Sequence, residues 1–409
     1  MILFYLLISV MPLTRHPLWG KFIGDLTVVK YLGVGCLLYA VFHMLQSGRR
    51  PAVLRSAQAR WFVFLALWSS VSWILYGDKT RWRLSPFLSF VSFVLLLFLT
   101  KTLVDTLDRL RAALLVSIGS VALASAYVCR EWQKFHAIVQ GFRPGWVTGD
   151  PNYFSISALL CLPLAFCLAM ESRAPLMRVF CGGSLAITFA ALMMASSRGA
   201  LLGLVTQMVF LAVRSRQPMR NCVILLLIAT PAGLLLRAGS LHRLLDPSAG
   251  DLQSSELRLT LWKAGLRMTA DSPLFGIGLG RFKGTVTRYG DLATEEAKVA
   301  HNSYVELAAE AGIPALIAFL GVLVCSFRSL ERVGRAATRH DFRLLRVSAL
   351  GLQAGLIAAA VALFFVSGQY QKLLWLTIFL SATMPALTVQ RLQAAAAERK
   401  AAQPLEVQA

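Results

Sequence analysis

The chain has few acidic side chains and lacks the local motifs of nucleotide, metal and serine chemistry. Its 409 residues contain 20 Asp and Glu against 41 Lys and Arg, a formal net charge of +21. It has no Gly-rich loop followed by Lys and Ser or Thr, no G-x-S-x-G segment, and no His, Cys and carboxylate cluster at metal-ligand spacing. These absences argue against ATP use, serine-hydrolase chemistry and metal catalysis, so we expect no metal ion and no cofactor.

The seven cysteines also lack C-x-x-C spacing, and they lie in or beside apolar runs. They are Cys36, Cys129, Cys161, Cys167, Cys181, Cys222 and Cys325. A thiol in an apolar segment behaves as a small hydrophobic side chain. We therefore interpret the cysteines as packing residues and not as ligands.

Long polar stretches are scarce, because 57% of the residues are hydrophobic and the mean hydropathy is +0.63. A soluble domain cannot bury so much apolar surface, so the sequence predicts an all-α polytopic integral membrane protein. Apolar runs between charged breaks give about twelve spans: 1–13, 26–45, 61–76, 84–99, 112–129, 153–170, 180–195, 199–213, 222–236, 304–325, 347–365 and 373–389. We interpret residues 1–409 as a single transmembrane domain that ends in a short tail at 390–409.

The basic residues are spread over the loops between spans and form no basic domain, which argues against nucleic acid as a partner. By the positive-inside rule, a moderate excess of Lys and Arg in alternate loops places both termini and the tail in the cytoplasm. The long loop at 237–303, between the ninth and tenth spans, then lies outside. A loop of this length usually carries function, and its arginines would meet an anionic substrate or membrane lipids.

His301 and Asn302 end this loop directly before the span at 304–325. Ser303 and Glu306 have the S-x-x-E spacing of a capping box, which predicts a helix that begins at Ser303. The partial positive charge of a helix N-terminus disfavours imidazolium, so His301 should be neutral, as a general base must be. The alternative is a boundary histidine that only faces water.

Three predicted spans, 153–170, 199–213 and 304–325, begin at the same outer surface, where their helix dipoles would favour an anion. Asn152 precedes the first of them. Arg198 stands at the start of the second, where the dipole disfavours a cation unless an anion is bound. The alternative is that Arg198 extends to phospholipid headgroups.

The segment SSELRLTLWKAGLRMTA in the long loop has helical periodicity, with Leu257, Leu261 and Ala264 on one stripe. Arg258 and Trp262 share another face, although an arginine on a helix is often only solvated. The following DSPLFGIGLGRFKG contains three alternating glycines, which permit a tight turn close to other backbone. This turn follows no strand and opens no helix, so it does not indicate dinucleotide binding.

Two charged residues lie inside predicted spans, where they normally imply a task or a partner. Glu310 is about two turns into its span and could pair with Lys30 or a loop arginine. We assign Glu310 no chemical role. Lys30 could reach a headgroup, a substrate phosphate or a glutamate.

Four segments give the chain a resemblance to the O-antigen ligase family, which is related to O-antigen polymerases and bacterial O-linked oligosaccharyltransferases. They are GDPNYFS at 149–155, SSRGALLGL at 196–204, RLTLWKAGLRMTADSPLFGIGLGRF at 258–282 and HNSYVELAAEAGIPALIAFLG at 301–321. The first half of the chain resembles the family only in hydropathy.

The resemblance implies a GT-C-type glycosyltransferase of the bacterial inner membrane that is metal-independent and inverting. Its donor would be a glycan on undecaprenyl pyrophosphate, and its acceptor a lipid A-core hydroxyl on the periplasmic side. Carried over to this chain, Arg198 and Arg258 would bind the pyrophosphate and His301 would activate the acceptor. Asn302, Asn152, Trp262 and Lys30 are candidates for supporting roles.

Several alternatives remain open at this point. A polymerase of the same superfamily would use a second lipid-linked glycan as acceptor, and an O-linked oligosaccharyltransferase would use a protein. The single dominant outer loop favours a ligase. A flippase or transporter for polyprenyl-linked sugars, or a scaffold without chemistry, would also be basic and polytopic.

Overall fold

The computed structural model describes residues 1–13, 28–48, 52–77, 85–139, 142–145, 150–214, 249–290 and 297–406, and within these ranges the regular structure is helical. Among the described residues, nine helices are long and apolar enough to cross a membrane: α3 (Val28–Ser47), α4 (Ala57–Tyr76), α5 (Ser85–Leu103), α6 (Leu107–Phe135), α7 (Pro151–Glu171), α8 (Pro175–Met194), α14 (Ser303–Arg339), α15 (Arg343–Ala362) and α16 (Lys372–Glu406). The prediction of an all-α polytopic membrane protein is confirmed.

Two further predicted spans correspond to shorter helices, namely α1 (Ile2–Val10), which continues into η1 (Met11–Leu13), and α9 (Arg198–Arg214). The predicted span at 222–236 lies outside the described residues, so the count of twelve stays a prediction. The helices run beyond the predicted spans, because a helix continues its backbone hydrogen bonds past the apolar run. The helix α14 has 37 residues.

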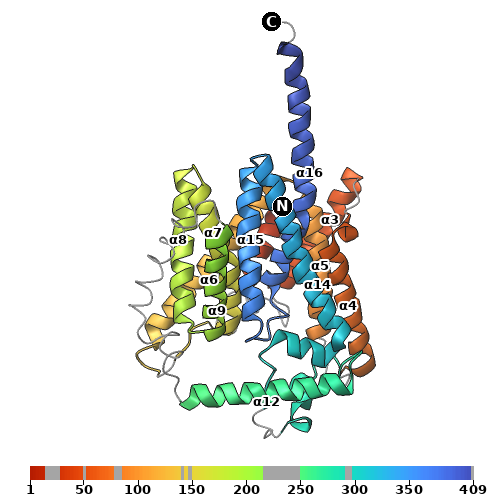
Figure 1. The fold of residues 1–409 in the computed structure, drawn as a ribbon, viewed down its shortest axis with the longest axis vertical. Helices are drawn as coiled ribbons and strands as arrows, with labels where there is room; N and C mark the ends of the chain where they lie inside the picture. The colour runs from red at the N-terminus through yellow and green to blue at the C-terminus, as the bar shows by residue number, and fades with distance from the viewer. Residues whose placement is uncertain are drawn as a thin grey trace.

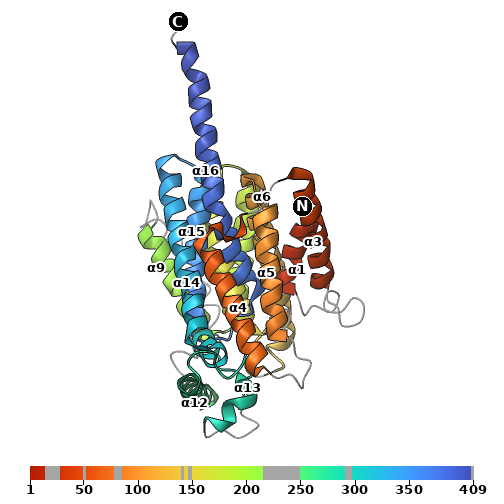
Figure 2. The same cartoon turned by 90° about the vertical axis from the view of Figure 1, so that its right-hand side faces the viewer.

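The long helices form a bundle, and α12 (Ala249–Asp271) lies across one end of it (Figure 1). The tail end of α16 projects from the opposite end, as Figure 2 also shows. The helices α7, α9 and α14 all begin at the end covered by α12. This agrees with the expectation that three helix N-termini share one surface.

The helix α15 packs against α7, α9 and α14, and glycines bring it close to α7 and α9. A Cβ at Gly355 would lie 2.8 Å from the Leu160 carbonyl oxygen, and a Cβ at Gly203 would lie 2.7 Å from the Ala358 carbonyl oxygen. Close backbone packing at small residues is a principal source of helix association in membranes. The starts of α7, α9 and α14 are thereby held in a fixed arrangement.

The helix α14 is interrupted at Gly312, whose φ is 84° and ψ is 173°. This break leaves carbonyl groups of the preceding turn without helical partners. The Ala309 and Glu310 carbonyls accept hydrogen bonds from the Ile277 and Gly278 N–H groups, at 2.9 and 3.1 Å. The glycine-rich turn predicted from the sequence therefore docks on the break.

The contact leaves no room for side chains, since a Cβ at Gly276 would lie 2.4 Å from the Glu310 carbonyl carbon. The Glu310 carboxylate accepts a hydrogen bond from the Phe282 N–H, at 3.0 Å. Among the described residues, no ion pair joins Glu310 to Lys30 or to an arginine. The backbone that follows the glycine turn is its partner.

Candidate active site at the helix N-termini

The starts of α7 and α9 are joined through the side chain of Asn152. Asp150 caps α7, with its carboxylate accepting from the Asn152 N–H at 2.7 Å. The Asn152 Oδ1 accepts from the Ser197 hydroxyl at 2.9 Å and from Arg143 Nη2 at 3.1 Å. Arg143 also donates from Nε to the Ala195 carbonyl at 3.1 Å. One amide thus holds two helix ends and an arginine together.

A small polar cavity of about 350 Å³ opens at this junction. Three arginines line it, Arg143, Arg198 and Arg258, together with Asn152, Ser196, Ser197, Gly199, Ser254 and Phe365. No carboxylate is among these lining residues. The first backbone N–H groups of α9 lie at the same place and add the positive end of a helix dipole. The cavity therefore has the charge and the donors that suit an anion.

The position of Arg198 depends on α12 as well as on its own helix. Arg198 is the first residue of α9, and its Nη2 donates to the Ser255 hydroxyl of α12 at 3.2 Å. Arg258 lies one turn further along α12 and is half-buried. The two guanidinium groups therefore reach one cavity from two different helices.

The helix α12 is fixed by its apolar stripe. Leu261, Ala264 and Met268 are fully buried and form a second small core together with Phe282 and Ala300. The predicted stripe of Leu261 and Ala264 is thus the packed face. Arg258 and Trp262 lie on a different face, as the periodicity predicted.

Trp262 connects α12 to the residue before His301. Its Nε1 donates to the Ala300 carbonyl at 2.9 Å, and the Glu306 carboxylate of α14 accepts from the Ala300 N–H at 3.0 Å. Both polar groups of Ala300 are therefore bound, one by each helix. His301 follows directly with φ 50°, a left-handed conformation that non-glycine residues seldom adopt. The two bonds to Ala300 stabilise the backbone that presents His301.

The pKa of His301 lies below its ordinary value of 6.5, chiefly because the side chain is removed from water. The Arg258 guanidinium lowers this pKa further, whereas the Asp150 carboxylate acts in the opposite direction. Both groups belong to the junction described above. The imidazole is consequently neutral near pH 7, the state in which it can accept a proton.

Residues 183–320 match the sequence model of a family described as O-Antigen ligase. This part of the chain is therefore similar to the O-antigen ligase family. The matched range holds Arg198, Arg258 and His301, so all three predicted site residues lie inside it. The curated proteins include none that matches the chain.

The N-terminus of α14 differs from the sequence prediction. The N-cap of α14 is Asn302, whose Oδ1 accepts from the Tyr304 and Val305 N–H groups at 3.0 and 3.1 Å. The predicted capping box of Ser303 and Glu306 is therefore wrong. An Asn side chain is as good a cap as Ser, and Asn302 thus serves the helix rather than the cavity.

Ser303 and Glu306 instead form hydrogen bonds with the connection between α15 and α16. The Ser303 hydroxyl donates to the Val366 carbonyl at 2.7 Å. Glu306 accepts from Gln369 Nε2 at 2.7 Å and from the Ser367 hydroxyl. These bonds hold the start of α14 against the C-terminal helices.

Lys30 does not belong to this site. It is exposed on α3, which packs against α1 and α5, and it is not among the residues that line the cavity. The expectation of a supporting role for Lys30 came from its intramembrane position alone. Arg143, in contrast, lines the cavity but was not predicted from the sequence. The sequence around it, FRPG at 142–145, has no helical or strand periodicity that would indicate a role.

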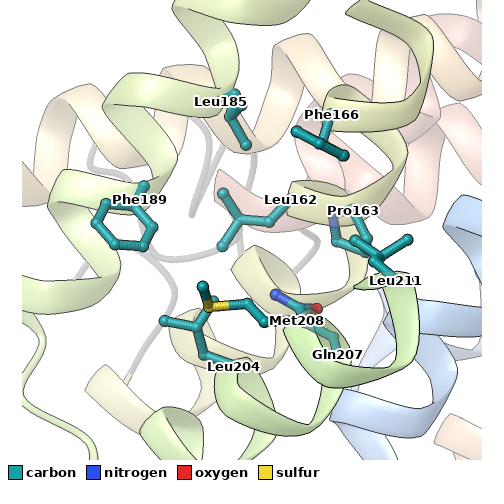
Figure 3. A pocket seen from close by; sticks show the side chains of 9 residues that line it. All are labelled: Leu162, Pro163, Phe166, Leu185, Phe189, Leu204, Gln207, Met208 and Leu211. Atoms are coloured by element: carbon teal, nitrogen blue, oxygen red, sulfur yellow. The ribbon is translucent and has the colours of Figure 1, made fainter. Parts of the chain in front are cut away.

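A separate pocket of about 390 Å³ lies among α7, α8 and α9. Its lining is apolar except for Gln207, which Figure 3 shows beside Met208 and Leu211. A pocket of this kind has no group that could balance a diphosphate. Among the described residues, no group of three or more His, Cys, Asp and Glu side chains could hold a metal ion.

Proposed function

We propose that this protein transfers a glycan from undecaprenyl pyrophosphate to a hydroxyl group of lipid A-core at the periplasmic surface of the inner membrane. Members of the O-antigen ligase family are glycosyltransferase-like enzymes of the ligase and polymerase type, and the family match covers Arg198, Arg258 and His301. The observation that carries the proposal is the cavity at the start of α9, which Arg198 and Arg258 line from two helices.

The arginines would bind the diphosphate of the donor. A guanidinium group can hold two phosphate oxygens at once and keeps its charge at any relevant pH. When the bond between the anomeric carbon and the pyrophosphate oxygen breaks, negative charge develops on the leaving group. Cations and helix N–H groups already in place stabilise that charge without reorganisation.

His301 would act as the general base. In a single displacement, the acceptor oxygen attacks the anomeric carbon, its proton passes to the neutral imidazole, and undecaprenyl pyrophosphate leaves. One displacement inverts the configuration at that carbon. The lowered pKa of His301 supports this role, since the imidazole is unprotonated when the hydroxyl arrives.

Replacement of His301 by Ala tests the base. We expect the purified variant to bind the lipid-linked donor as the parent does and to transfer glycan at least 100-fold more slowly, because a positioned base contributes about 10²–10⁴-fold. The assay uses a labelled undecaprenyl-pyrophosphate glycan with lipid A-core and a second lipid-linked glycan as competing acceptors. Label on the second glycan would identify a polymerase, and unimpaired transfer by the variant would remove His301 from the mechanism.

Replacement of Arg198 or Arg258 by Ala tests the diphosphate site. We expect donor binding to weaken by about 10-fold to 100-fold, since a hydrogen bond to a charged group is worth about 1.5–3 kcal/mol. Lys263→Ala is the matched control, because Lys263 is an exposed cation on the same helix outside the cavity. Equal donor affinity in all three variants would contradict the proposal.

A further inference from the structure

An open cavity of about 1770 Å³ lies at the opposite end of the bundle from α12. It is formed where α4 begins and α5 ends, beside the later turns of α14 and the middle of α16. Figures 1 and 2 place these helix segments on the side from which the tail of α16 projects. This cavity is therefore separate from the candidate active site.

Positive charge dominates the lining of this cavity. Four cations contribute to it, Arg55, Arg60, Lys101 and Arg332, and the lining has one carboxylate, Asp105. Asp105 is paired with Arg109, which approaches it to 2.6 Å. Among the ion pairs between described residues, none involves any of the four cations.

Three of the four cations have only backbone carbonyl groups as partners. Lys101 Nζ donates to the Ala382 carbonyl at 3.0 Å, Arg60 Nη1 donates to Leu54 at 3.2 Å, and Arg332 Nε donates to Arg328 at 3.4 Å. A carbonyl group satisfies a donor but does not neutralise its charge. Four cations beside one carboxylate that is already paired make the cavity strongly positive, which favours an anion.

Donor groups at the start of α4 point to the same conclusion. The N-cap residue Ser56 makes no side-chain capping bond, so the first N–H groups of α4 lack a side-chain acceptor at the cavity. Gln58 is only 2% exposed and lines the cavity. Within the described part of the chain, its Nε2 and the Ser56 Oγ have no hydrogen-bond partner. Buried donors without partners cost free energy unless a ligand satisfies them.

We propose that this cavity binds the phosphate headgroup of an anionic phospholipid. Phosphate oxygens would accept from Lys101 and Arg55 and from the start of α4, which explains a cation cluster and an uncapped helix together. Exposed apolar side chains, Ala386 and Val389, lie beside the cations in the same lining. A soluble anion has no apolar group that could pack on this surface, whereas a phospholipid has acyl chains next to its headgroup.

The test compares lipid binding to the detergent-purified full chain and to the variant Arg55→Gln/Lys101→Gln. Bound lipid is counted by native mass spectrometry, and melting temperature is measured with phosphatidylglycerol, phosphatidylcholine or inorganic phosphate added. We expect phosphatidylglycerol to bind and raise the melting temperature of the parent. Its affinity for the variant should fall by roughly 30-fold, because each cation near an anionic headgroup contributes about fivefold.

The matched control is Arg328→Gln/Arg339→Gln, which removes two exposed cations from α14 that do not line the cavity. It should bind phosphatidylglycerol as the parent does. Lys101→Arg keeps the charge and should also retain binding, which separates charge from a general folding defect. Equal affinity of the two double variants would overturn the proposal. Equal binding of phosphatidylcholine, or binding of inorganic phosphate without lipid, would also overturn it.

Discussion

At the scale of single residues, the site is organised around the peptide groups that precede His301. Trp262 and Glu306 bind the carbonyl and the N–H of Ala300 from two helices. Because Trp262 lies one turn from Arg258 on α12, the element that carries the arginine also holds the backbone of the histidine. In the proposed mechanism, diphosphate binding and the position of the base therefore depend on the same helix.

If His301 is the base, as proposed, the pH dependence of transfer follows its pKa. Its pKa is lowered in the folded protein, so the imidazole stays neutral as the pH falls through 6.5 and is protonated only at a lower pH. We expect the acidic limb of the pH profile of kcat to lie below 6.5 at saturating donor. The variant Lys298→Gln removes an exposed cation that also lowers this pKa and should move the limb upward. A limb above 6.5 in the parent would contradict the assignment.

The substitution Trp262→Phe tests the bond to Ala300. It keeps the ring but removes the donor, which leaves a buried carbonyl unpaired at a cost of about 1–3 kcal/mol. We expect kcat to fall about tenfold or more, with donor KM unchanged because Arg258 is untouched. Trp61→Phe, at a partly exposed position on α4, is the control and should leave kcat as in the parent. A change in donor KM alone would mean that Trp262 contacts the donor.

At the scale of elements, the break in α14 determines where the glycine turn and α12 lie. The Ile313 N–H donates to the Pro273 carbonyl at 2.8 Å, and Trp68 Nε1 of α4 donates to the Leu274 carbonyl at 3.0 Å. The turn is therefore fixed between α4 and α14. Since α12 leads into this turn, the break at Gly312 also helps to fix the position of Arg258 on α12.

The substitution Gly312→Ala tests this role of the break. A Cβ there would lie 2.1 Å from the Leu274 carbonyl oxygen, in a left-handed conformation that is strained for Ala. We expect a loss of stability of about 1–3 kcal/mol or more, measured as a lower melting temperature, together with weaker donor binding. Gly334→Ala is the control in the same helix, since its Cβ would meet only Ala349 at 3.8 Å. Equal melting temperatures would show that the turn does not need the break.

At the scale of the whole molecule, each end of the bundle has a cavity lined by cations, and the two cavities differ in size and in what surrounds them. The end covered by α12 holds the arginine cavity and His301, and the other end holds the larger cationic cavity and the tail of α16. By the positive-inside rule, the tail end is expected to be cytoplasmic. The two anion sites would then lie on opposite surfaces of one membrane.

Cysteine labelling tests this orientation. Lys263→Cys on α12 and Arg339→Cys at the end of α14 introduce thiols at exposed positions on opposite ends of the bundle. We expect a membrane-impermeant maleimide to label only the first in spheroplasts and both after permeabilisation. The unsubstituted protein gives the background from native cysteines. Labelling of position 339 alone in intact spheroplasts would reverse the topology and remove the proposed periplasmic site.

The sequence alone predicted the helical membrane class, the positions of most spans and the three residues of the proposed mechanism. Hydropathy and helix-end chemistry depend on near neighbours in the chain, so they can be read locally. Arg198, Arg258 and His301 were candidates because each stands at or near a helix end or on a marked helix face, and the resemblance to the O-antigen ligase family supplied their proposed roles. Only the packing of the helices brings the starts of α7 and α9 together with the Arg258 face of α12.

The same reasoning explains what was missed. Arg143 joins the cavity through Asn152, which also accepts from Ser197, 45 residues away in the chain. Ala300 is held by Trp262 across 38 residues, and Glu306 binds the connection between α15 and α16 instead of capping its own helix. Hydrogen bonds of this kind join residues that only packing brings together, so no local pattern could reveal them.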